Sequence, residues 1–109
     1  MALEVHGRNV VVTPYLAERI ERGLRPALDE PASAVERVTV RLESARGSAA
    51  PLCHIFVSLR PSGGVVIQDA GPSLLAAIDA AVARTLAALH REARRRAPVS
   101  ARPAYAAME

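Results

Sequence analysis

Two neighbouring segments of the chain place apolar residues at every second position over most of their length, and this pattern constrains the fold most. The segments are VERVTVRLES at 35–44 and LCHIFVSLR at 52–60. Their apolar members are Val38, Val40 and Leu42 in the first segment and Cys53, Ile55, Val57 and Leu59 in the second. A period of two residues predicts β-strands that bury one face. The turn sequence PSGG after the second strand predicts that the next run, VVIQDA at 65–70, returns as an antiparallel partner.

Two other segments repeat their apolar residues with a helical period. The first follows Thr13, a candidate N-cap, and Pro14, which suits a first helical turn because its missing N–H is no loss there. Its apolar stripe consists of Leu16, Ile20, Leu24 and Ala27. Gly23 and Pro26 disfavour helix, so we expect this helix to kink or stop near Arg25.

The second helix is predicted to be the longer and to begin near Ser73, another candidate N-cap. Its apolar stripe consists of Leu75, Ile78, Val82, Leu86, Leu89 and Ala93. A short alternating strand at 3–7 precedes the first helix. The predicted order is therefore β-α-β-β-β-α, an α+β fold with a four-stranded mixed sheet and both helices packed on one face. We expect one domain at 1–97 and a flexible C-terminal tail at 98–109, where proline and small residues replace any periodicity.

Several classes of protein do not fit the sequence. No apolar run is long enough to span a bilayer, and the first residues do not resemble a secretory signal. The single cysteine, Cys53, is predicted to be a buried, unreactive thiol in a cytoplasmic protein. His6, His54 and His90 lie on different elements without metal-ligand spacing, and no acid, base and nucleophile converge. We therefore expect no metal, no cofactor, no small-molecule substrate, no membrane and no enzymatic activity.

The net charge of +3 comes from the C-terminal third of the chain, since the charges of residues 1–70 cancel. On the second helix, Arg84, Arg91 and Arg95 repeat at i, i+7 and i+11, which predicts a ridge nearly opposite the apolar stripe. Arginines suit contacts with phosphates. The alternative is an ordinary solvated helix end, where basic residues favour the helix dipole.

Three further arginines complete the candidate RNA-contact set. Arg94 lies within the same basic cluster, and Arg19 and Arg22 share the outward face of the first helix with Tyr15. Glu18 and Glu21 flank Arg19 and Arg22, so a salt-bridged, solvated face is the simpler interpretation there. Because aromatic residues are scarce, any RNA binding is expected to use backbone charge and shape rather than sequence.

Two motifs resemble those of the ribosome hibernation-promoting factor family, also called ribosome-associated inhibitor A or sigma-54 modulation protein. VHGRNVVVTPYL resembles the opening strand, turn and helix of that family, and SLLAAIDAAVARTL resembles the start of its second helix. The resemblance covers about residues 2–97. It implies a cytoplasmic, non-enzymatic factor that binds the small ribosomal subunit through the 16S rRNA backbone and blocks the decoding region for messenger and transfer RNA. Arg84 and Arg91 fall where the family carries basic residues.

The chain also departs from the family pattern. Ser73 and Leu75 stand where the family has Asp and Tyr, and Ala17, Pro26 and Ala87 stand where its helices often carry basic residues. These departures leave a second hypothesis open, a family-fold protein-interaction module that has lost ribosome binding.

Overall fold

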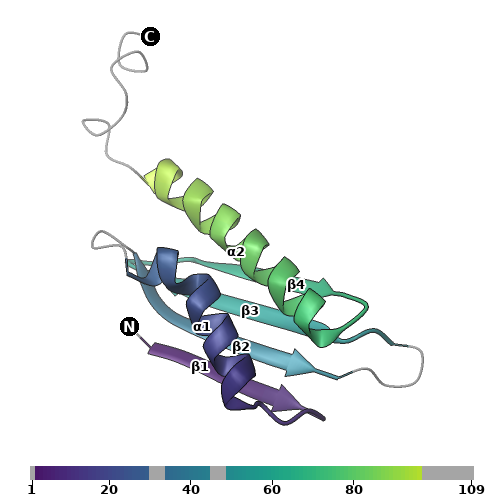
Figure 1. Cartoon of the computed structure of the whole chain (residues 1–109). Helices are drawn as coiled ribbons and strands as arrows, with labels where there is room; N and C mark the ends of the chain where they lie inside the picture. Colours follow the sequence, from purple (N-terminus) through teal and green to yellow (C-terminus); the bar gives the residue numbers. More distant parts are fainter. Residues whose placement is uncertain (1, 30–33, 45–48, 97–109) are drawn as a thin grey trace, which may run out of the picture.

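The computed structural model describes residues 2–29, 34–44 and 49–96, and it confirms the predicted α+β fold (Figure 1). The elements are β1 (Ala2–Arg8), α1 (Pro14–Leu28), β2 (Val35–Glu43), β3 (Leu52–Leu59), β4 (Gly64–Ala70) and α2 (Leu74–Arg96). The predicted tail at 98–109 lies outside the described residues.

The four strands form one sheet in the order β1-β2-β3-β4. β1 pairs with β2 in parallel, because α1 carries the chain back to the starting end of the sheet. β2, β3 and β4 are antiparallel to one another, so the sheet is mixed as predicted. Both helices cross the same face of the sheet, as Figure 1 shows, and neither of them lies over the other face.

The core lies between the sheet and the helices. The alternating apolar residues of β2 and β3 are buried as the sequence predicts, and Ile20, Leu24 and Ile78 cover them from the helices. The side chain of Cys53 is fully buried there. Most polar strand residues point to the helix-free face. His54 is nevertheless buried there, and its Nε2 lies 2.6 Å from Glu43 Oε2.

Both predicted N-caps are confirmed. Thr13 Oγ1 accepts a hydrogen bond from the Leu16 backbone N–H at 3.2 Å, and Ser73 Oγ accepts one from Ala76 at 3.1 Å. Each bond pairs one of the backbone donors that a helix start leaves unsatisfied. The two caps therefore set where α1 and α2 begin.

The expected end of α1 near Arg25 is wrong, because the helix runs through Pro26 to Leu28. Pro26 removes one helical hydrogen bond, but the chain keeps its helical path after it and Asp29 N–H bonds to Arg25 O. Gly23 also has a packing role. A Cβ built on Gly23 would lie 2.9 Å from Cγ1 of Val82, so this glycine lets α1 approach α2 closely.

Candidate nucleic-acid interface

Four arginines of α2 are exposed, namely Arg84, Arg91, Arg94 and Arg95, but the buried stripe of the helix is displaced from its predicted position. Ala77, Ala81 and Thr85 are fully buried, so the buried face of α2 is rotated about the helix axis from the predicted one. Thr85 tolerates burial because its hydroxyl donates to Ala81 O at 2.8 Å. The ridge of Arg84, Arg91 and Arg95 therefore lies on the flank of α2, roughly a quarter turn from the stripe at about 100° per residue, rather than opposite it.

Arg84 uses this flank position to contact β4. Its Nη1 donates to Asp69 Oδ1 at 3.0 Å and to Gln68 O at 3.3 Å. The Asp69 side chain is only 19% exposed, whereas that of Arg84 is 59% exposed. Arg84 thus joins α2 to the outer strand of the sheet and is already partnered within the fold.

The C-terminal turns of α2 carry Arg91, Arg94 and Arg95, of which only Arg95 has an ion-pair partner among the described residues. Arg95 Nη1 lies 3.1 Å from Glu92 Oε2, an i,i+3 ion pair. Arg91 and Arg94 are exposed, and neither has an ion-pair partner within the described ranges 2–29, 34–44 and 49–96. Surface arginines without acidic partners keep their full attraction for phosphate groups.

The arginines of α1 are neutralised within the fold. Arg19 bonds to Asp79 of α2, Arg22 pairs with Glu18, and Arg25 lies within ion-pair distance of Glu21. The predicted salt-bridged face of α1 is therefore present. Arg19 and Arg22, two of the predicted RNA-contact residues, each have an acidic partner.

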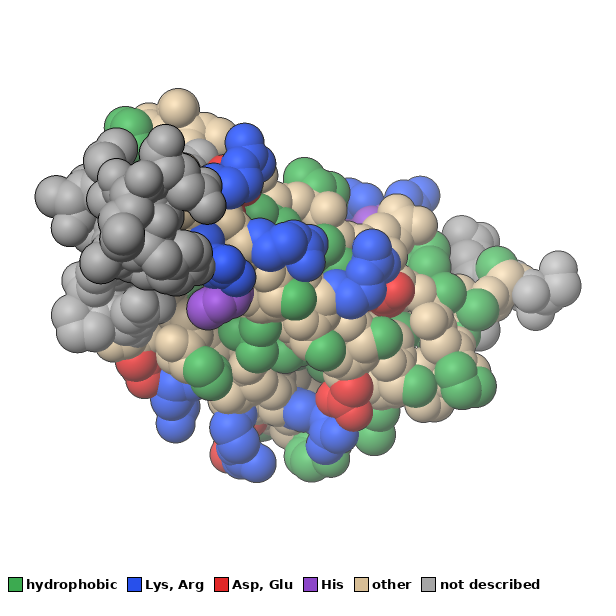
Figure 2. All heavy atoms as spheres, turned by 90° about the horizontal axis from the view of Figure 1, so that it is seen from above, with side chains coloured by type: hydrophobic (Ala, Val, Ile, Leu, Met, Phe, Trp, Pro, Cys, Tyr) green, Lys and Arg blue, Asp and Glu red, His purple; other side chains and the backbone are tan. Residues whose placement is uncertain are grey.

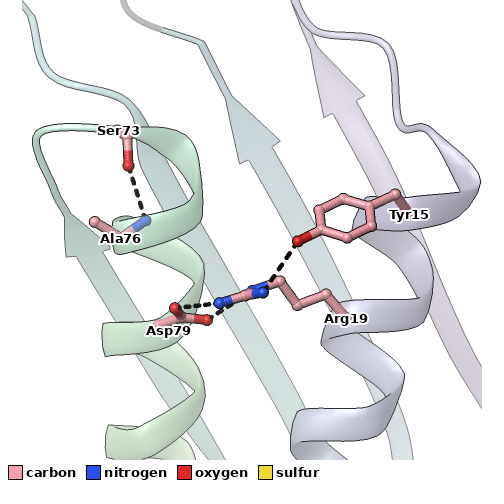
Figure 3. A network of polar contacts seen from close by, with 5 residues as sticks. All are labelled: Tyr15, Arg19, Ser73, Ala76 and Asp79. Atoms are coloured by element: carbon pink, nitrogen blue, oxygen red, sulfur yellow. Dashed lines mark hydrogen bonds and ion pairs between the residues drawn. The ribbon is translucent and has the colours of Figure 1, made fainter.

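The pair between Arg19 and Asp79 joins the two helices across 60 residues of sequence (Figure 3). Arg19 Nε donates to Asp79 Oδ1 at 3.1 Å, and Nη2 donates to Oδ2 at 2.7 Å. The remaining nitrogen, Nη1, donates to the hydroxyl of Tyr15 at 3.1 Å. The hydrogen bond from Arg19 lowers the pKa of Asp79, and the same bond raises the pKa of Arg19.

Charge is therefore distributed unevenly over the surface of the molecule. Figure 2 shows a row of blue arginine side chains across the middle of the view with little red among them, whereas the blue side chains along the lower edge lie beside red ones. The surplus of positive charge that the sequence places in its C-terminal third thus remains available to an anionic partner.

The described residues also bear on metal binding, membrane insertion and thiol reactivity. Within them, no group of three or more His, Cys, Asp and Glu side chains gathers where one metal ion could bind. Neither described helix has the length and apolar composition needed to cross a membrane. Burial, and to a smaller extent the charge of Asp69, raises the pKa of the Cys53 thiol to about 12, which makes it a poor nucleophile.

Two acids that determine these contacts were not among the predicted site residues. Asp69 and Asp79 each bind a predicted RNA-contact arginine, Arg84 and Arg19 respectively. The sequence gives one signal for Asp79, which is the only acidic residue in the N-terminal half of a helix that carries several arginines. Asp69 gives a similar signal, since a carboxylate stands where the alternation of β4 requires a core-facing residue.

Comparison with known proteins supports one family. Residues 3–97 match the family model described as sigma 54 modulation protein / S30EA ribosomal protein. The crystal structure of the Thermus thermophilus Protein Y N-terminal domain is 28% identical in sequence, with a TM-score of 0.70 over 84% of this chain and 98% of that one. No protein of curated function matches the sequence.

A second solved structure shows the same fold at lower identity. The ribosomal subunit interface protein from Coxiella burnetii is 16% identical, with a TM-score of 0.71 over 84% of this chain and 97% of that one. The β-α-β-β-β-α arrangement is therefore shared by proteins with very different sequences.

Proposed function

Because the chain belongs to the sigma 54 modulation protein / S30EA ribosomal protein family, we propose that it is a cytoplasmic, non-enzymatic factor that binds the small ribosomal subunit. Bound there, it inhibits translation by occupying the decoding region, which messenger and transfer RNA then cannot enter. The family match over 95 of 109 residues, from 3 to 97, is the observation that carries this proposal.

The surface charge supports contact with the 16S rRNA backbone. Arg91 and Arg94 are exposed and have no acidic partner in the described part of the chain, and Arg95 is 77% exposed beside Glu92. Phosphate groups along an RNA backbone attract such guanidinium groups and release counterions when bound, so the affinity falls as salt rises. Contacts of this kind position a protein on RNA without recognising the base sequence. Such contacts suffice for a factor that blocks the decoding region by occupying it.

Co-sedimentation of the purified protein with small subunits at two or more salt concentrations tests the proposal. The parent is expected to co-sediment at low salt and to inhibit translation in a purified system. The double variant Arg91→Gln/Arg94→Gln is expected to bind more weakly and to flatten the slope of log K against log salt by about 1.4–1.8 units, at 0.7–0.9 per phosphate contact.

The control variant is Arg8→Gln/Arg37→Gln, which removes the same charge from the strands. Both residues are exposed, and the alternation of β1 and β2 directs them away from the helices. This variant is expected to keep most of the binding. A folded parent that does not co-sediment at low salt would overturn the proposed function.

One observation favours the alternative, a protein-interaction module of the same fold. Arg19, Arg22 and Arg25 of α1 are all within ion-pair distance of an acid, so this helix offers little surplus charge to RNA. If this alternative holds, the parent stays in the supernatant at low salt, and the Gln variants of α2 change nothing.

A further inference from the structure

Tyr15 presents an aromatic ring on the helix side of the molecule. The residue is 58% exposed. The described residues contain one Phe, Phe56, and it is half-buried in the sheet. An aromatic side chain with more than half of its surface in water contributes little to the core. Most of its surface is therefore free to contact a flat group outside the fold, such as a base.

The ring is held in place by a chain of hydrogen bonds. The Tyr15 hydroxyl accepts a bond from Arg19 Nη1, and Asp79 grips the same guanidinium through two further bonds (Figure 3). A side chain that is fixed before binding loses less conformational entropy when a partner docks on it. The helix–helix pair of Arg19 and Asp79 thus also orders the exposed ring.

Arg19 has donors left after these bonds. A guanidinium carries five N–H groups, and the bonds to Asp79 and Tyr15 use one on each of its three nitrogens. The Arg19 side chain is 38% exposed, so its remaining donors can be reached from solvent. An aromatic face and free guanidinium donors next to each other match the two parts of a nucleotide, a flat base and an anionic phosphate.

We propose that Tyr15 and Arg19 form a nucleotide-contact site, in which the Tyr15 ring stacks on an unpaired ribosomal RNA base and Arg19 donates to an adjoining phosphate. Asp79 is a positioning residue, which fixes the guanidinium and, through it, the ring. This inference rests on the proposed function and adds a second contact to the backbone contacts of α2. The inference also explains how Asp79, an acidic residue, can favour binding of an anionic partner, because it acts by holding Arg19 in place.

Substitutions at Tyr15 test the stacking contact by co-sedimentation with small subunits. Tyr15→Leu removes the ring and is expected to raise the Kd by about 5- to 150-fold, the range for loss of one stacked base. The salt slope is expected to stay unchanged, because no charge is lost. Tyr15→Phe keeps the ring but loses the hydrogen bond from Arg19 that orders it, so it is expected to bind more weakly than the parent and more tightly than Tyr15→Leu. Val66→Ala, at an exposed apolar residue on the helix-free face, is the control and is expected to have no effect.

Asp79→Asn separates a positioning role from simple electrostatics. The substitution raises the net charge by one, so a surface that binds RNA by charge alone would bind more tightly. A positioning role predicts weaker binding instead, because a neutral amide cannot hold the guanidinium as the carboxylate does. Tighter binding by the folded variant would overturn the role of Asp79.

Ultraviolet cross-linking of the complex identifies what Tyr15 contacts. The expected product is a nucleotide attached to the peptide that contains Tyr15, found by mass spectrometry. A cross-link from Tyr15 to a ribosomal protein, or a Tyr15→Leu variant that binds as the parent does, would overturn this inference while leaving the proposed function intact. If the parent itself fails to co-sediment, both proposals fall.

Discussion

The guanidinium of Arg84 in α2 closes over the carboxylate of Asp69 in β4, with Nη1 and Oδ1 3.0 Å apart. The other carboxylate oxygen, Oδ2, is buried and has no hydrogen-bond partner among the residues that the structure describes. Arg84 is therefore the cation that compensates a largely buried acid. Its place in the fold differs from that of Arg91 and Arg94, which have no such task.

Replacing Arg84 with alanine is expected to destabilise the protein. The substitution leaves a buried carboxylate without its charged partner, and an unsatisfied buried polar group costs about 1–3 kcal/mol in the free energy of unfolding. Urea-induced unfolding followed by circular dichroism measures the change. The double variant Arg84→Ala/Asp69→Ala is expected to recover part of the loss, since it removes the orphaned acid as well. An unchanged urea midpoint in Arg84→Ala would contradict the prediction.

Gly23→Ala is expected to lower stability although alanine favours helix by about 1 kcal/mol. The new Cβ would meet Cγ1 of Val82 at 2.9 Å, and a β-branched valine in a helix has little rotamer freedom to move aside. Overpacking of this kind costs about 1–3 kcal/mol, so the net loss is up to about 2 kcal/mol.

Thermal unfolding of Gly23→Ala, Val82→Ala and the double variant forms a cycle that tests the contact. The double variant is expected to be more stable than the sum of the two single effects predicts, because the smaller residue 82 makes room for the methyl group. Additive effects would show that the two helices do not meet at this point.

Local sequence patterns predicted the order of the helices and strands correctly. They did not predict the contacts between residues that are far apart in the sequence. The alternation of β2 and β3 and the caps Thr13 and Ser73 depend on neighbours a few residues away, so the sequence predicts them directly. The pair of Arg19 and Asp79 depends on how the two helices cross, and the periodicity within one helix carries no information about that crossing. The buried stripe of α2 was placed wrongly for a related reason. Alanines are only weakly hydrophobic, so their burial is hard to predict. Thr85 is a polar residue by type, but it can be buried because its hydroxyl bonds to a carbonyl of its own helix. The burial of Asp69 required the register of β4.

Cys53 is expected to react slowly with a thiol reagent in the native protein. Its side chain is fully buried and its pKa is raised to about 12, so at neutral pH almost none of it is the reactive thiolate. Labelling with a chromogenic disulfide is expected to be slow in buffer and fast in denaturing urea. Similar rates in the two conditions would show that the thiol is accessible in the folded state.

The bond between Arg19 and Asp79 makes stability depend on pH in the acid range. The pKa of Asp79 is lower in the folded state than its ordinary value, so the ionised carboxylate favours folding. This contribution is fully present above the unfolded pKa of about 3.9 and is lost as the pH falls through the lowered folded value.

Urea midpoints of the parent and Asp79→Asn, measured from neutral pH downward, test this sign. The parent is expected to be the more stable protein at neutral pH, and the difference is expected to shrink in the acid range. A difference that stays constant down to the lowest pH at which both fold would show that Asp79 does not contribute through its charge.

β1 lies at the edge of the sheet and is the strand that can detach most easily. This strand has only one neighbour, β2, and its core-facing side chains Leu3 and Val5 are half-buried rather than buried. β2, β3 and β4 form a meander of sequence neighbours, so β1 can detach without breaking it, and its amide hydrogens are expected to exchange with deuterium before those of β3. Each such opening uncovers the backbone donors and acceptors along the edge of β2, a row that a strand from another copy can pair with. While it stays paired, the N-terminal strand therefore keeps that edge of β2 from forming such a swapped pair.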